Sequence, residues 1–190
     1  LSTLDDKTFS DGMAEVIKYG CIRDASLFDR LAVLGGREGV MSEIEEAVYT
    51  CCDIKRALVM EDERDTGARM ILNFGHTLGH AYELAGGYKT WTHGQAVAAG
   101  MVAAARIGNA LGVTPDGVET KIRGILRQYK LPEYIECPPE ILREAVALDK
   151  KSSGTSVRLI LLKELGEAVI FSIEREKLLS VAAACMGERK

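Results

Sequence analysis

The sequence lacks several features that would each assign it to a familiar class of protein. No run of lysine and arginine is long enough to suggest a nucleic-acid track or an anionic membrane surface, and the net charge is −4. No apolar run approaches the roughly 18 residues that cross a bilayer, and no signal-peptide pattern is visible. We therefore expect neither nucleic acid nor a membrane as a partner.

Cysteine is scarce and irregularly placed. The five cysteines are odd in number, include the adjacent pair Cys51 and Cys52, and show no C-x-x-C spacing, which argues against a disulfide framework and a thiolate zinc site. We expect a cytoplasmic, reducing location. Neither G-x-G-x-x-G nor a Walker A sequence occurs, and no serine is framed as a nucleophile elbow, so phosphate loops and covalent hydrolase chemistry lack support.

Histidine is also scarce, yet its three copies, His76, His80 and His93, fall within eighteen residues. Arg69, Asn73, His76 and His80 recur at offsets of four, three and four, so one continuous helix would align them on a narrow polar stripe. Apolar residues cover the remaining circumference, and we expect the stripe to face a cleft or an internal polar site and not open solvent. Two imidazoles one turn apart are a common way to hold a divalent metal or an anion.

Hydrophobic periodicity predicts a mainly α, multi-helix domain with a small β-hairpin near the C-terminus, and residues 1–190 as one domain. A hairpin is expected at 157–162 and 168–173, around Gly166. The expected helices, read from apolar spacing and from capping residues, are 11–34 up to Gly35-Gly36, 42–61 with Ser42 as N-cap, the stripe-bearing helix from the 62–67 connection to Gly86-Gly87, 93–112 capped by Thr92, one from Thr114-Pro115 to Tyr129, one from Pro138-Pro139 to about 149–151, and 174–185.

A catalytic divalent metal needs three protein ligands and one open position, and two histidines with one carboxylate are a standard set. His76 and His93 lie on different predicted helices. We select Glu15 as the carboxylate because it sits in the apolar turn MAEVIKYG, where an unpaired carboxylate would be costly to bury. The alternative is that Glu15 pairs with Lys18 on a solvated face, as many i, i+3 pairs do.

Cations that could gather around the same cavity would suit an anionic substrate carrying carboxylate and phosphate. The alternative for each lysine is an ordinary exposed cation, and the arginine on the stripe is the best supported. The candidates are Lys18, Lys55, Arg69 and Lys150 or Lys151.

Three segments closely resemble the C-terminal half of the 3-dehydroquinate synthase family: GMAEVIKYG at 12–20, EDERDTGARMILNFGHTLGHAYE at 61–83 and THGQAVAAGM at 92–101. With DKK at 149–151 in register, the resemblance covers essentially the whole chain. The pattern R-x-x-x-N-x-x-H-x-x-x-H followed by H-G-x-A-V is far more specific than a lone H-x-x-x-H. Leu78 and Gln95 stand where an aromatic residue and a glutamate are common in the family, and neither is a proposed ligand.

The resemblance implies roles for individual residues. Glu15, His76 and His93 match the family's metal ligands for Zn²⁺ or Co²⁺, the set also selected above from the residues. His80 is expected to assist proton movement rather than to bind the metal, and Lys18 and Asn73 are expected to join it in catalysis. The positions matching substrate contacts are Lys18, Lys55, Arg69, Asn73, His80 and one lysine of the DKK motif, Lys150 or Lys151.

The resemblance also implies an activity. The family converts 3-deoxy-D-arabino-heptulosonate 7-phosphate to 3-dehydroquinate and phosphate in the shikimate pathway of aromatic amino acid biosynthesis. It is a carbon–oxygen lyase that uses bound NAD⁺ for a transient oxidation. A homodimer is expected. The family's N-terminal nucleotide-binding domain is expected to be absent from residues 1–190, so we expect this chain alone to lack turnover.

Two alternatives stay open. One is another sugar-phosphate cyclase or a metal-dependent polyol dehydrogenase of the same architecture, which the match at Arg69, Asn73 and His80 ranks lower. The other is a non-catalytic metal-binding helical module. A structural metal site is closed by four protein ligands, and no fourth ligand is evident in the sequence.

Overall fold

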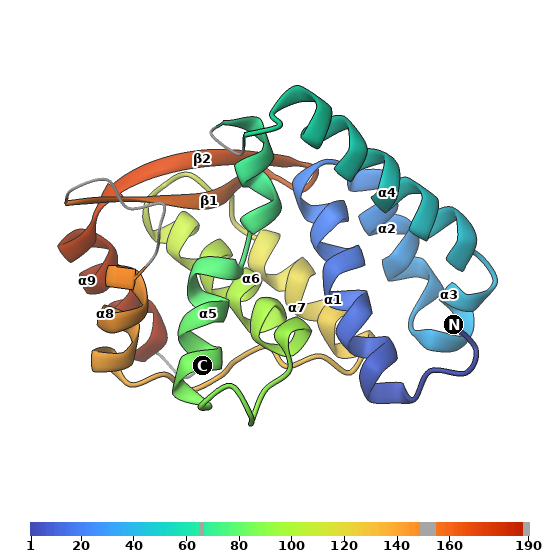
Figure 1. The fold of residues 1–190 in the computed structure, drawn as a ribbon, viewed down its shortest axis with the longest axis horizontal. Helices are drawn as coiled ribbons and strands as arrows, with labels where there is room; N and C mark the ends of the chain where they lie inside the picture. Colours follow the sequence, from blue (N-terminus) through green and yellow to red (C-terminus); the bar gives the residue numbers. More distant parts are fainter. Residues whose placement is uncertain (65–66, 149–154, 188–190) are drawn as a thin grey trace.

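Helices carry most of the chain in the computed structural model, which describes residues 1–64, 67–148 and 155–187. A two-stranded antiparallel sheet lies along one side of the helices (Figure 1). The mainly α prediction with a C-terminal hairpin is therefore confirmed. The described elements are α1 (Asp6–Ile22), α2 (Ala25–Leu34), α3 (Arg37–Met41), α4 (Ile44–Glu61), the 3-10 helix η1 (Ala68–Asn73), α5 (His76–Ala85), α6 (His93–Ala110), α7 (Val118–Gln128), α8 (Pro139–Leu148), β1 (Ser156–Glu164), β2 (Glu167–Glu174) and α9 (Arg175–Gly187).

Helix α6 is the central element of the fold and packs against α1, α5, α7 and α9 (Figure 1). Thr92 caps it as predicted, in a reciprocal capping box with Gln95. Most of its alanines and glycines are buried, because small side chains let neighbouring backbones approach closely. A Cβ at Gly100 would lie only 2.1 Å from the carbonyl oxygen of Gly75, so only glycine fits there.

The single helix predicted for 11–34 is wrong, because the chain forms two helices that meet at Arg23 and Asp24. The Asp24 carboxylate accepts hydrogen bonds from the Leu27 amide at 3.0 Å and from the Ser26 hydroxyl at 2.6 Å. It therefore caps a new helix in the middle of a continuous apolar pattern. The predicted stop at Gly35 is confirmed.

The helix predicted for 42–61 begins two residues later, and the short helix α3 precedes it. Ser42 is not its N-cap, since the Ser42 hydroxyl donates to the Gly39 carbonyl at 2.7 Å and so closes α3. The apolar spacing of this helix predicts Val48, Cys51 and Leu58 on its buried side; Cys51 and Leu58 are buried, whereas Val48 is 41% exposed.

The stripe-bearing helix is not continuous, and this is the main correction to the predicted fold. A 3-10 helix ends at Asn73, Phe74 is extended with ψ 128°, and Gly75 adopts φ +79° before α5 begins at His76. A Cβ at Gly75 would lie 2.8 Å from the Val97 carbonyl oxygen, so the close contact with α6 requires glycine. Arg69 and Asn73 therefore do not extend the helical stripe that His76 and His80 begin.

The C-terminal third follows the predictions except at one cap. Helix α7 begins after Gly117, which occupies the N-cap position. Thr114, in the pair predicted to open this helix, is buried and does not cap it. Helix α8 begins at the predicted proline pair, and the hairpin pairs Val157 with Ile173 in antiparallel register. The closing helix is also present, as α9.

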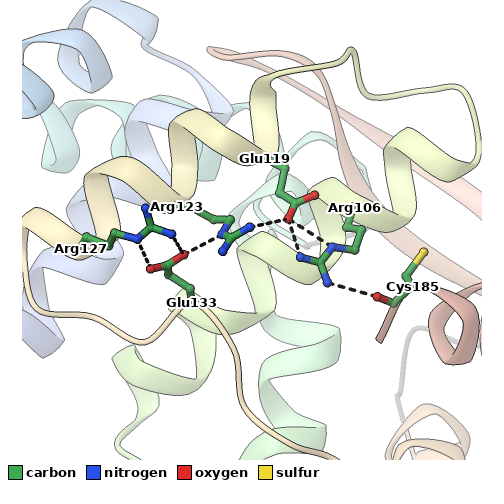
Figure 2. A network of polar contacts seen from close by, with 6 residues as sticks. All are labelled: Arg106, Glu119, Arg123, Arg127, Glu133 and Cys185. Carbon is green, nitrogen blue, oxygen red and sulfur yellow. Dashed lines mark hydrogen bonds and ion pairs between the residues drawn. The ribbon is translucent and has the colours of Figure 1, made fainter. Parts of the chain in front are cut away.

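Charged side chains join α7 to its neighbours in what we call the arginine–glutamate network (Figure 2). Glu119 of α7 accepts from one arginine of α6 and lies 3.7 Å from a second arginine in α7. Glu133, in the segment after α7, accepts from two arginines of that helix. The members are Arg106, Glu119, Arg123, Arg127, Glu133 and the backbone carbonyl of Cys185 in α9.

The described residues bear on two features that the sequence does not predict, a membrane-spanning helix and disulfide bonds. None of the described helices is long and apolar enough to cross a bilayer. No disulfide joins the five cysteines, all of which lie in the described part of the chain.

Candidate metal centre

Three helices bring together the residues selected as a metal-binding set. Glu15 lies on α1, and His76 and His93 are the first residues of α5 and α6. One ligand atom from each residue lies within 4.8 Å of the other two. The distance from Glu15 Oε1 to His76 Nε2 is 3.8 Å. Two ligands about 2.1 Å from a tetrahedral ion lie about 3.4 Å apart, so a small closing movement would seat a Zn²⁺-sized ion.

A backbone carbonyl determines how the His76 ring is oriented. His76 Nδ1 lies 3.1 Å from the carbonyl oxygen of Phe74. A carbonyl only accepts, so Nδ1 carries the proton and Nε2 of the neutral ring keeps its lone pair for a ligand. In a continuous helix the Phe74 carbonyl would instead point along the axis toward the amide of residue 78. The break at Phe74 and Gly75 therefore contributes directly to the site.

A carboxylate contacts the second histidine. His93 Nδ1 lies 3.1 Å from Oε1 of Glu83, whose side chain is only 15% exposed. Glu83 is not among the site residues predicted from the sequence. Its position seven residues after His76, on the same face of a helix, was the available signal.

Glu15 has one satisfied and one unsatisfied oxygen. Lys18 Nζ donates to Oε2 at 2.6 Å, so the i, i+3 pair is present, but it is only partly solvated, since the Lys18 side chain is 3% exposed and the Glu15 side chain 36%. Oε1 is buried and has no hydrogen-bond partner among the described residues. A buried carboxylate oxygen without a donor is costly, and a cation at this point would remove that cost. The residues present thus fit a divalent metal.

Electrostatics favours the ligand forms of the side chains. Burial, together with the positive charge of Lys18, lowers the pKa of His76 to about 4, so the ring is neutral at pH 7. Neutral imidazole is the form that binds metals. Burial also lowers the pKa of Lys18, and the neighbouring Glu15 carboxylate opposes that shift.

His80 lies beside the three candidate ligands. Its ring centroid is 5.9 Å from that of His76 and 6.5 Å from that of His93. It is not a member of the group whose ligand atoms converge. Its side chain is exposed and lines a cleft of about 450 Å³ together with His93, Glu83 and Tyr88.

The remaining predicted substrate contacts are placed unevenly. Lys55 is exposed on α4, and its charge is a minor cause of the lowered pKa of Lys18, after burial. Arg69 Nη1 donates to the Glu63 carbonyl at 3.2 Å, and Asn73 Nδ2 donates to the Met70 carbonyl at 3.0 Å. Both groups are thus bonded to nearby backbone. The two candidate lysines of the DKK motif, Lys150 and Lys151, lie outside the described residues.

Comparison with solved structures identifies the fold of the chain, which is shared by two solved synthases. A 2-epi-5-epi-valiolone synthase from Streptomyces hygroscopicus subsp. jinggangensis 5008, with NAD⁺ and Zn²⁺ bound, superimposes with a TM-score of 0.79 at 22% identity, over 99% of this chain and 53% of that one. A 2-deoxy-scyllo-inosose synthase complexed with carbaglucose-6-phosphate, NAD⁺ and Co²⁺ gives 0.82 at 22% identity, over 100% and 55%.

Sequence comparison narrows this fold to one family. The family model described as 3-dehydroquinate synthase C-terminal matches residues 12–152. The chain therefore belongs to the 3-dehydroquinate synthase family, as its motifs predicted. It is 48% identical over 172 residues to the 3-dehydroquinate synthase of Clostridium beijerinckii, covering 90% of this chain and 49% of that protein. The corresponding enzyme of Streptococcus sanguinis is 41% identical over 180 residues, covering 94% and 51%. The chain spans about half the length of these curated relatives.

Proposed function

We propose that this chain forms the metal- and substrate-binding half of a 3-dehydroquinate synthase. The reaction is the conversion of 3-deoxy-D-arabino-heptulosonate 7-phosphate to 3-dehydroquinate and phosphate, a carbon–oxygen lyase reaction. The observation that carries the proposal is the convergence of Glu15, His76 and His93, in which the buried Oε1 atom of Glu15 has no hydrogen-bond donor among the described residues. The chain that carries this group belongs to the family.

Glu15 Oε1 and one ring nitrogen from each of His76 and His93 would hold Zn²⁺ or Co²⁺. The bound ion supplies Lewis acidity toward a substrate hydroxyl or carbonyl. A set of three protein ligands is typical of catalytic metal sites, whereas structural sites have four. The metals and NAD⁺ named with the two solved synthases support these cofactors, with NAD⁺ acting in the full-length protein.

The surrounding side chains would bind and orient the anionic substrate. Lys18 uses one N–H to fix Glu15 and has two further donors for a substrate oxygen. His80, on the wall of the cleft, is the group we assign to proton movement. The other proposed contacts to carboxylate, hydroxyls and phosphate are Lys55, Arg69, Asn73 and Lys150 or Lys151.

The alternatives are less well supported. The two solved cyclases with other products share only 22% identity with the chain, against 48% for a named 3-dehydroquinate synthase. A non-catalytic metal module would need a fourth ligand, and the converging group in the described residues has three members. A cytoplasmic homodimer is part of the proposal through family membership, and the absence of disulfides among the described cysteines fits a reducing compartment.

A ligand-stabilisation experiment tests the substrate without requiring turnover. The Zn²⁺-loaded chain is heated with 3-deoxy-D-arabino-heptulosonate 7-phosphate or with sedoheptulose 7-phosphate, which lacks the carboxylate. A ligand present at about 100 times its Kd stabilises the folded state by about 2.7 kcal/mol. We expect the heptulosonate phosphate to raise Tm more than sedoheptulose 7-phosphate does. We expect its effect on Tm to be smaller in K18M than in the parent chain. Equal or greater stabilisation by sedoheptulose 7-phosphate would contradict the proposed substrate.

A further inference from the structure

Glu83 is the one carboxylate in the described structure that lies within hydrogen-bond distance of Nδ1 of a candidate metal-binding histidine. We propose that Glu83 is a positioning residue that sets the tautomer and orientation of His93 for metal binding. This inference rests on the proposed function, because it presupposes that His93 binds the metal.

The hydrogen bond between His93 and Glu83 determines the tautomer of His93. An ionised carboxylate has no hydrogen to donate, so the 3.1 Å contact requires His93 Nδ1 to be the donor. In the neutral ring the lone pair is then on Nε2. Metal-binding histidines generally donate their other N–H to a carboxylate or a carbonyl, which fixes the ring and raises the basicity of the ligating nitrogen.

His76, the other candidate metal-binding histidine, is held in a similar way. His76 has its Nδ1 on the Phe74 carbonyl, at the same 3.1 Å. Both histidines therefore have their Nδ1 atoms occupied by acceptors, one from the backbone and one from a side chain. The acceptor for His93 is a side chain, and the His93 side chain is itself 47% exposed. The bond to Glu83 therefore restrains a ring that is partly open to solvent.

The backbone of Glu83 is held in place independently of its side chain. Glu83 lies in the last turn of α5, and its backbone carbonyl accepts the amide of Tyr88 at 2.8 Å. This bond closes the turn that leads toward α6, and it involves no side-chain atom. Replacing the Glu83 side chain therefore removes the contact with His93 while leaving the backbone connection, and alanine is fully compatible with the helix. A role in folding and a role in positioning can thus be separated.

The experiment is a Co²⁺ titration of the 190-residue chain, followed by the visible d–d absorption of the bound ion. Outer contacts of this kind change metal affinity by about 10 to 100-fold. We expect E83A to weaken Co²⁺ binding within that range and to alter the absorption bands. E83Q, whose amide oxygen can still accept from Nδ1, should recover most of the affinity. Thermal unfolding of the metal-free parent chain, E83A and E83Q should give similar midpoint temperatures.

Two controls separate the possible failures. E119Q removes a carboxylate charge from the arginine–glutamate network, away from the histidines, and should leave Co²⁺ affinity unchanged. E15A should abolish tight binding. If the parent chain binds no Co²⁺, the proposed metal centre fails and this inference fails with it. If the parent binds, E15A does not, and E83A matches the parent in affinity and spectrum, the inference alone is overturned. A loss in E119Q equal to that in E83A would also overturn it.

Discussion

The molecule contains two polar clusters of opposite character, and the contrast between them indicates where function lies. In the arginine–glutamate network, both carboxylates are met by arginine side chains from neighbouring elements (Figure 2). In the candidate metal centre, Glu15 Oε1 is buried without a donor and faces an imidazole nitrogen 3.8 Å away. The network is complete without a ligand and joins helices. We propose that the candidate metal centre is completed by a cation.

The largest effect should come from removing a ligand of the incomplete cluster. H93A should weaken Co²⁺ binding by more than about 100-fold, because one of three protein ligands is lost. The His93 side chain is 47% exposed, so the free energy of unfolding of the metal-free chain should change by less than about 1 kcal/mol. Metal titration and denaturant unfolding measure the two quantities.

The matched control for H93A is H80A. His80 lies within 6.5 Å of the His93 ring, measured between centroids, but does not belong to the converging ligand group. Its replacement should leave Co²⁺ affinity within a few-fold of the parent value. A loss in H80A comparable to that in H93A would show that the ligand set has been wrongly assigned.

The second prediction perturbs the helix contact that brings Glu15 and His93 together. A Cβ at Gly94 would lie 2.2 Å from the Asp11 carbonyl oxygen, so G94A must push α1 away from α6. Overpacking of this kind costs about 1 to 3 kcal/mol of stability, and the displacement should weaken metal binding as well. G124A is the control, since nothing lies within 4 Å of that position, and it should stabilise α7 by up to about 1 kcal/mol. Equal behaviour of the two variants would refute the close-contact explanation.

The third and smallest effect tests the complete cluster. The hydrogen bond from Arg127 is the main cause that lowers the pKa of Glu133 below its ordinary value of 4.5, with Arg123 adding to it. A lowered folded-state pKa stabilises the protein above the unfolded pKa, and this stabilisation is lost as pH falls through the folded value. E133Q should therefore cost about 1 kcal/mol at neutral pH, and the difference from the parent should shrink in acid.

Urea unfolding at about pH 7 and about pH 3 measures that difference, because the two values lie on either side of the carboxylate titration. E167Q is the comparison, since the Lys163 and Glu167 pair is more than half exposed and should contribute close to nothing. A pH-independent cost in E133Q would mean that packing rather than charge explains the contribution of Glu133. Neither variant should change Co²⁺ affinity.

Much of the fold could be predicted from sequence wherever local and tertiary preferences agree. The Thr92 cap, the stop at Gly35 and the hairpin around Gly166 all combine strong local signals with an apolar pattern that points the same way. The failures occur where one contact overrides a continuous pattern. Asp24 divides the 11–34 helix by capping, and Gly75 divides the stripe-bearing helix because α6 lies too close for any Cβ.

The convergence of the three candidate ligands was predictable from the sequence, but their supporting contacts were not. The sequence shows where a carboxylate would be costly to bury and where histidines are concentrated, which led to Glu15, His76 and His93. It does not show that the Phe74 carbonyl becomes available for His76, because that requires a break that only the contact with α6 imposes. Glu83 was missed for a similar reason, since its partner His93 comes from the next helix.

The most direct test of the metal centre is a crystal structure of the chain loaded with Zn²⁺. We predict one ion bound by a Glu15 carboxylate oxygen and by Nε2 of His76 and His93, at about 2.0 to 2.2 Å, with the remaining position taken by a non-protein ligand. A fourth protein ligand, or an ion bound elsewhere with Glu15 still held only by Lys18, would contradict this account.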